Sequence, residues 1–235
     1  MPPEVVVGNE ADLGETLARQ VEDEARLALG ERGRFAIALP GGSVAETFFP
    51  RLALTAVDWS RCHFFWGDER AVVPTDPESN FALARRLWLT PAHVPAGCVH
   101  RMAAEVGDLE VAAAAYADEM RRFLGSPPRL DMALLGVGPD GHVCSLFPGH
   151  PLLRERRRLV AAVLDSPKPP PRRLTLTLPT LASAGLVVVV ATGEAKAAAM
   201  REALTNPGSN LPVALVTRRA KRILLLLDRA ASAGH

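Results

Sequence analysis

The sequence predicts an α/β protein with a mostly parallel sheet and helices on both of its faces. Two observations lead to this prediction. Short, continuously apolar segments recur along the chain, as in strands buried on both sides, and amphipathic helical segments alternate with them. In addition, glycine-rich turns follow several of the predicted strands, and open sheets of this class place their sites at such turns.

The first part of the chain alternates strand and helix. Residues 5–7 are a candidate strand, and residues 11–29 carry apolar side chains at helical spacing. Gly30 and Gly33 are expected to end that helix. The segments that follow are strand 35–39, helix 44–54, strand 62–66, loop 74–80 and helix 81–89.

The second part continues the alternation. An alanine-rich helix is predicted over residues 103–123, and the proline-rich residues 166–173 are expected to form a stiff, extended loop. A helix is predicted over residues 193–204, and residues 213–216 are an apolar segment near the end of the chain. The remaining predicted strands are 130–135, 159–164, 174–178, 186–191 and 223–227.

The composition is that of an ordinary globular domain. Of the 235 residues 48% are apolar, the formal net charge is +1, and no repeat or long linker divides the chain. We therefore expect one domain over residues 1–235, as a monomer or weak homo-oligomer. The near-neutral charge gives no support for binding nucleic acid or an acidic membrane.

Cysteine use and hydropathy predict a cytoplasmic protein. The three cysteines have no metal-ligand spacing and are odd in number, which argues against disulfides and structural zinc. No signal peptide is visible at the N-terminus, and no apolar stretch is long enough to cross a bilayer.

Four motifs place polar side chains directly after predicted strands. Because the carboxyl ends of parallel strands share one edge of a sheet, we expect the four to converge. They are residues 41–43 (Gly-Gly-Ser), 67–70 (Gly-Asp-Glu-Arg), 140–142 (Asp-Gly-His) and 193–196 (Gly-Glu-Ala-Lys).

Each motif also has a simpler interpretation. The glycine-serine turn could bind a phosphate, or Ser43 could merely cap a helix. Arg70 could be held by adjacent carboxylates and aimed at an anionic substrate, or residues 68–70 could be a solvated charge cluster. Asp140 and His142 could form a site or belong to a tight turn. The basic run at residues 154–158 is expected to be solvated.

The histidines do not suggest a metal site. His142 is the one histidine in a glycine turn after a strand, and His63 lies inside an apolar strand, where we expect a core residue. His93, His100 and His150 have no acidic or cysteine partner at ligand spacing, so metal binding has little support.

Taken together, these motifs resemble the 6-phosphogluconolactonase family. The resemblance rests on residues 40–43, 66–70 with Ser79 and Asn80, 136–149, 166–170 with 173–175, and 193–196, all in order. It implies a Rossmann-like open sheet of the NagB/RpiA type. It also implies hydrolysis of 6-phospho-D-glucono-1,5-lactone to 6-phospho-D-gluconate in the oxidative pentose phosphate pathway, with no metal and no organic cofactor.

The resemblance also implies roles for individual residues. His142 would be the general base, Asp140 would orient it, and Arg70 would stabilise the oxyanion or bind the phosphate. Arg172 is an adjacent rival to Arg173. The residues expected to bind the substrate are Gly41, Gly42, Ser43, Asp68, Arg173 and Lys196. Cys144 is expected to be a small packing residue, because the lactone needs no covalent nucleophile.

Two other functions are weighed against the lactonase. Glucosamine-6-phosphate deaminases share the Asp-Gly-His turn, but in that family a glutamate supports the histidine, and Phe147 occupies its place here. A phosphosugar-sensing domain of a regulator would need a DNA-reading helix-turn-helix, and no basic segment before Val5 supplies one.

Overall fold

The computed structural model describes residues 3–233 and has a six-stranded, fully parallel sheet at its centre. This confirms the predicted fold class. In spatial order the strands are β1 (Glu4–Gly8), β9 (Ile223–Asp228), β8 (Leu186–Ala191), β5 (Met132–Gly136), β2 (Phe35–Leu39) and β3 (Cys62–Trp66).

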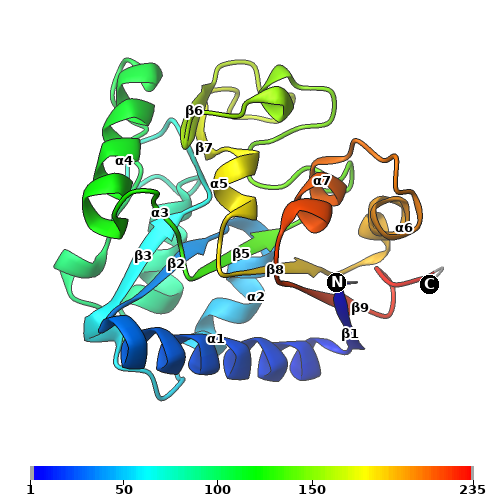
Figure 1. The fold of residues 1–235 in the computed structure, drawn as a ribbon, viewed down its shortest axis with the longest axis horizontal. Helices are drawn as coiled ribbons and strands as arrows, with labels where there is room; N and C mark the ends of the chain where they lie inside the picture. The colour runs from blue at the N-terminus through cyan, green and yellow to red at the C-terminus, as the bar shows by residue number, and fades with distance from the viewer. Residues whose placement is uncertain (1–2, 234–235) are drawn as a thin grey trace.

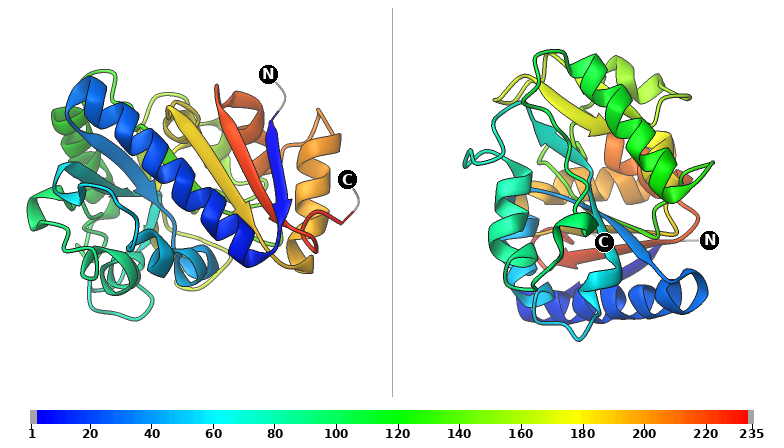
Figure 2. Two further views of the ribbon diagram at one scale, coloured as in Figure 1. Left: turned by 90° about the horizontal axis from the view of Figure 1, so that it is seen from below. Right: turned by 90° about the vertical axis from the view of Figure 1, so that its left-hand side faces the viewer.

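Helices cover both faces of this sheet, as the alternating pattern predicts (Figure 1). The helix α1 (Glu10–Arg32) crosses one face and packs against β1, β2 and β9, and the left-hand view of Figure 2 shows it running across the strands. Gly33 ends α1 in the left-handed conformation, whereas Gly30 lies within the helix. The other helices are α2 (Gly42–Leu52), α3 (Asn80–Ala84), α4 (Leu109–Leu124), α5 (Leu178–Ala182), α6 (Ala197–Thr205) and α7 (Pro212–Arg219).

A second, antiparallel sheet was not predicted. It contains β4 (Asp68–Arg70), β7 (Arg173–Leu176) and β6 (Val160–Val163), and α4 packs against β6 and β7. β6 is continuously apolar, so its sequence does not show the direction of its partner, and the polar Arg173 and Thr175 of β7 are buried as well. The buried apolar side chains of this second sheet belong to the same hydrophobic core as those of the main sheet.

Several predicted boundaries shift for local reasons. The helix expected over residues 103–123 begins only at Leu109, because the carboxylate of Asp108 accepts the backbone N–H groups of Glu110 and Val111. The strand expected over 174–178 ends at Leu176, and Pro179 lies in the first turn of α5. The apolar residues 213–216 lie in α7, and a short 3₁₀ turn, Glu194–Lys196, precedes α6.

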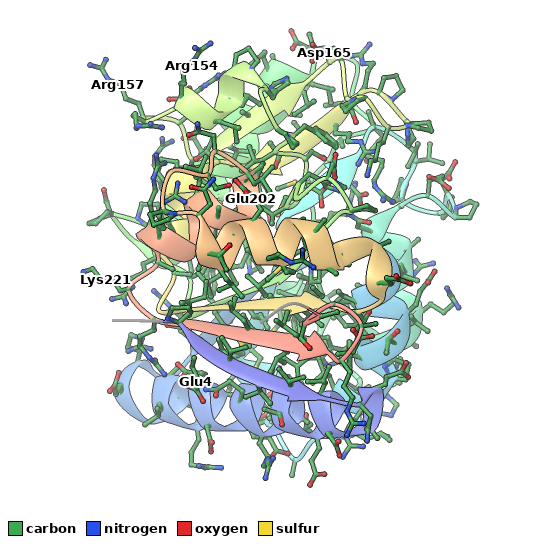
Figure 3. All side chains as sticks on the ribbon, turned by 90° about the vertical axis from the view of Figure 1, so that its right-hand side faces the viewer. Glu4, Arg154, Arg157, Asp165, Glu202 and Lys221 are labelled. Atoms are coloured by element: carbon green, nitrogen blue, oxygen red, sulfur yellow. The ribbon has the colours of Figure 1, made fainter. Side chains whose placement is uncertain are left out.

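The far end of the molecule carries the basic run at residues 154–158. Arg154 and Arg157 are exposed and project outward (Figure 3). This agrees with the expectation that the run is solvated.

Candidate active site

A cavity of about 250 Å³ lies at the carboxyl edge of the parallel sheet. The four predicted turns follow the neighbouring strands β2, β3, β5 and β8, and each contributes to the wall. Of the residues proposed from the sequence, those that line the cavity are Gly41, Gly42, Ser43, Asp68, Arg70, His142, Arg173 and Lys196. Asp140 does not line it, but it is hydrogen-bonded to His142.

The turn after β5 presents His142 together with its carboxylate partner. Backbone hydrogen bonds from Gly138 N to His142 O and from Gly141 N to Gly138 O, both 2.9 Å long, close the turn. Gly141 has a φ of +80°, which favours glycine. The Nδ1 atom of His142 lies 2.5 Å from Asp140 Oδ1, and this contact makes Nδ1 the proton-bearing nitrogen. The lone pair of His142 is then on Nε2.

The electrostatic surroundings keep the imidazole of His142 neutral, which is the form that can act as a base. Burial lowers the pKa of His142, and Lys168 lowers it further, against the opposing effect of Asp140. Burial acts to raise the pKa of Asp140, but the hydrogen bond with His142 and the charges of His142 and Lys168 hold it below its usual value. At neutral pH the arrangement is therefore a neutral imidazole beside a carboxylate.

Lys168 is a site residue to which the sequence reasoning assigned no role. Its Nζ atom lies 3.3 Å from His142 Nδ1 and 3.5 Å from Asp140 Oδ1, and it lines the cavity. The available signal was its place in the proline-rich block at residues 166–170, one of the blocks that carry the family resemblance. Prolines on both sides of it in that block stiffen the segment that presents it.

Arg173 holds the loop that carries Lys168. Its guanidinium donates to the carbonyl oxygens of Lys168, Pro169 and Pro170 at 2.9–3.1 Å, and its Nη1 lies 3.5 Å from Ser145 Oγ. Burial lowers the pKa of Arg173. The neighbouring Arg172 is exposed and donates to Gly107 O, away from the cavity, so of these two arginines only Arg173 lines it.

The glycine-serine turn opens helix α2 at the cavity. Gly41 is the N-cap residue, no side chain caps the helix, and Ser43 lies inside its first turn. The interpretation of Ser43 as a helix cap is therefore wrong. The first backbone N–H groups of α2 lack helical partners and, with the helix dipole, they favour an anion at this end.

The charged residues 68–70 are not the solvated cluster that was one interpretation. Asp68 is 6% exposed and accepts a hydrogen bond of 2.6 Å from Ser145 Oγ, with Arg173 Nη1 at 3.9 Å. Glu69 is 3% exposed and accepts hydrogen bonds from backbone N–H groups of Arg70, Asn80 and Phe81. Burial raises the pKa of Glu69, against these hydrogen bonds.

The adjacent carboxylates do not hold the Arg70 guanidinium, contrary to the other interpretation. Its Nη1 instead donates to the Glu78 carbonyl oxygen at 2.6 Å. Arg70 and Lys196 line the cavity together with Lys168 and Arg173, so four cationic side chains meet there. Burial, and secondarily the charge of Lys168, lowers the pKa of Lys196. This excess of positive charge suits an anionic ligand.

Two neighbours of His142, Cys144 and Phe147, restrict the reactions that this site can catalyse. The Cys144 thiol faces a Gly67 backbone that has no room for a Cβ atom, and burial raises its pKa well above the usual range. It is therefore no activated nucleophile. Phe147 is 2% exposed, and its ring centroid lies 4.9 Å from that of His142. An apolar ring thus contacts the histidine.

The other histidines within residues 3–233 lie outside the cavity. His63 Nδ1 lies 3.0 Å from His100 Nε2, and His100 and His150 contact the distant carboxylates of Glu119 and Asp165. Within residues 3–233, no group of three or more His, Cys, Asp and Glu side chains could hold a metal ion. None of the described helices is both long and apolar enough to cross a membrane.

Known proteins similar to this chain fall into one family. The model of a family described as glucosamine-6-phosphate isomerases/6-phosphogluconolactonase matches residues 8–225. The 6-phosphogluconolactonase of Rattus norvegicus is 43% identical over 97% of this chain and 91% of its own length. That of Streptomyces coelicolor is 40% identical over 98% of this chain and 94% of its own length.

Solved structures of 6-phosphogluconolactonases are also similar to this chain, at lower sequence identity. The 6-phosphogluconolactonase of Trypanosoma brucei has a TM-score of 0.87 at 26% identity and covers 98% of this chain and 97% of its own. A monomeric glucosamine-6-phosphate deaminase has a TM-score of 0.82 at 20% identity, with full coverage of both chains, which is a likeness of fold alone.

Proposed function

The chain belongs to the glucosamine-6-phosphate isomerase/6-phosphogluconolactonase family, and we propose that it hydrolyses 6-phospho-D-glucono-1,5-lactone to 6-phospho-D-gluconate. It is then a carboxylic ester hydrolase of the oxidative pentose phosphate pathway. Curated relatives that are 40–43% identical over nearly the whole chain carry this activity in their names.

The observation that carries the mechanism is the hydrogen bond from His142 Nδ1 to Asp140. It directs the lone pair to Nε2, and the lowered pKa of His142 keeps the ring neutral at pH 7. A lactone carbonyl is already electrophilic, so one general base that takes a proton from water is sufficient. Asp140 orients the ring and stabilises the imidazolium that forms.

The other side chains serve the charges of the substrate. Addition of water creates an oxyanion, and we assign to it two kinds of donor, the backbone N–H groups of the glycine turn that carries His142 and the guanidinium of Arg70. The phosphate lies at the N-terminus of α2, near Gly41, Gly42 and Ser43, with Lys196 and Arg173. Asp68, fixed by Ser145, faces the same cavity and accepts hydrogen bonds from the sugar hydroxyls.

The deaminase alternative is less well supported by the same geometry. In deaminases of this fold a glutamate supports the catalytic histidine, whereas the buried ring of Phe147 contacts His142 here. A phenyl ring neither accepts a proton nor orients an imidazole by a hydrogen bond.

We also propose a cytoplasmic setting and a monomeric or weakly associated state.

Replacing the base tests the proposal. We expect His142→Ala to lower kcat by at least about 100-fold, the usual contribution of a general base, with an unchanged fold. The measurement is proton release from freshly generated 6-phosphogluconolactone, with glucosamine 6-phosphate assayed in parallel. His150→Ala is the matched control, because His150 contacts Asp165 outside the cavity. A near wild-type rate in His142→Ala would overturn the assignment.

A further inference from the structure

Asn80 contacts the glycine turn at the N-terminus of α2 so closely that only glycine fits opposite it. A Cβ atom placed on Gly41 would lie 1.8 Å from Asn80 Oδ1, 2.4 Å from its Cγ and 2.9 Å from its Nδ2. The backbone of Gly41 is extended, with φ −108° and ψ −160°, and any residue can adopt it. The need for glycine at position 41 therefore comes from Asn80 and not from backbone conformation.

Asn80 is itself held rigidly. It is 1% exposed, and its Nδ2 donates to the backbone oxygen of Asp68 at 2.9 Å and to Asp68 Oδ1 at 3.2 Å. Its backbone N–H donates to Glu69 Oε1 at 2.8 Å, and Glu69 Oε2 accepts from Ser79 Oγ and Phe81 N. The amide orientation is thus fixed by two acceptors on Asp68.

This orientation leaves the other end of the amide without a partner. Asn80 Oδ1 is buried and accepts no hydrogen bond from any described residue, and it faces Gly41. A buried acceptor without a partner costs free energy, so a purely structural amide at this place is unfavourable. However, Asn80 contacts Gly41 in the turn after β2 and is hydrogen-bonded to Asp68 in the turn after β3, so it fixes the distance between these two turns.

We propose that Asn80 is a positioning residue that locks residues 41–43 against Asp68, and that position 41 is glycine because of this lock. The consequence for catalysis rests on the proposed function, in which residues 41–43 bind the phosphate and Asp68 binds the sugar. The lock holds these two binding groups at one separation before the substrate arrives, which lowers the ordering cost of binding.

A double-mutant cycle tests the lock. On the wild-type background, Gly41→Ala places its Cβ atom in collision with Asn80, and we expect KM for the phosphorylated lactone to rise by at least about tenfold. We expect kcat to change less, because His142 and Asp140 lie on a different turn. In Asn80→Ala the three nearest atoms are gone, and adding Gly41→Ala should raise KM by no more than about twofold.

Gly42→Ala is the matched control. Gly42 has a φ of +62° and no atom within 4 Å of an added Cβ, so its replacement strains the backbone without touching Asn80. Its effects on KM and on the urea midpoint should therefore be the same on the wild-type background and on the Asn80→Ala background. If the effects of Gly42→Ala depend on Asn80 as strongly as those of Gly41→Ala do, the lock is overturned.

The urea midpoint of all variants separates this proposal from the proposed function. Rescue of the Gly41→Ala midpoint by Asn80→Ala supports the lock even if the wild type fails to hydrolyse the lactone, which would refute only the function. Additive effects on both midpoint and KM in an active enzyme overturn the lock alone. If Gly41→Ala does not fold, recovery of folded protein in the double mutant supports the lock, and failure to recover it, on both Asn80→Ala and Asn80→Ser backgrounds, refutes it.

Discussion

The Nδ1 atom of His142 lies close to both a carboxylate and an ammonium group, and the pKa of the imidazole depends on burial and on these two charges. Burial and Lys168 lower this pKa, whereas Asp140 raises it. A general base must be neutral, so kcat/KM falls as the pH drops through the pKa of His142 in the free enzyme. Activity should therefore persist to a lower pH than an ordinary histidine would allow.

Lys168→Met should move the acidic limb of the pH profile of kcat/KM to higher pH. Removing the positive charge 3.3 Å from Nδ1 favours the imidazolium, so the pKa of His142 rises and activity is lost earlier on acidification. Asp140→Asn should shift the limb the opposite way, and it should also lower kcat because the ring loses its orienting partner. The measurement is the pH profile of kcat/KM. A limb that stays in place in Lys168→Met would show that the ammonium does not act on His142.

Gly138 is a second position where a side chain is excluded by a functional group. A Cβ atom there would lie 1.9 Å from His142 Nδ1 and 2.6 Å from Asp140 Oδ1. Gly138→Ala should therefore displace the imidazole and lower kcat by about 100-fold, as loss of the base would. Gly97→Ala, at a glycine with no atom within 4 Å of an added Cβ, is the control. Similar kcat values for the two variants would contradict the geometry.

At the scale of elements, the packing of β3 against α4 depends on an uncharged histidine. His63 of β3 lies 3.0 Å from His100 Nε2, and its ring centroid is 3.9 Å from that of Phe123 in α4. Burial, and after it the charges of His100 and Arg34, lowers the pKa of His63 to about 4. Glu119 also belongs to this cluster, through its contact with His100 at 2.7 Å.

This predicts a loss of stability on mild acidification. The unfolded chain protonates His63 near pH 6.5 and the folded protein only near pH 4, so the unfolded state binds more protons between these values. The free energy of unfolding should fall as the pH drops through this window and level off below it. Urea unfolding at about pH 4.5–7.5 measures the slope, which should be smaller in His63→Gln than in the wild type. His93→Asn, at a site outside this cluster, should keep the wild-type slope.

The elements also show how far the sequence alone could lead. The parallel sheet was predictable because β2, β5 and β8 are continuously apolar, and the turns that follow them were visible as glycines beside polar or charged residues. The antiparallel sheet was not, because an apolar run such as β6 does not reveal its partner. Neither was the contact of Asn80 with Gly41, since the two residues come from different turns and only the fold brings them together.

At the scale of the whole molecule, the candidate site joins the two sheets. Gly42 and Lys196 follow strands of the parallel sheet, whereas Arg173 belongs to β7 and holds the Lys168 loop. Both sheets share one hydrophobic core, and the single domain over residues 1–235 stays a prediction. A ligand that touches all of these groups would connect elements that otherwise meet only through that core.

We therefore expect the product to stabilise the entire fold and its phosphate to supply most of the effect. At a concentration about 100 times its Kd, 6-phosphogluconate should add about 2.7 kcal/mol to the free energy of unfolding, whereas gluconate at the same concentration should add much less. Lys196→Ala should reduce the shift in Tm and raise KM for the phosphorylated lactone, because it removes a cation from the cavity wall. High salt should weaken the effect by screening these charges. Equal shifts in Tm with gluconate and 6-phosphogluconate would mean that the cations around the cavity do not bind the phosphate.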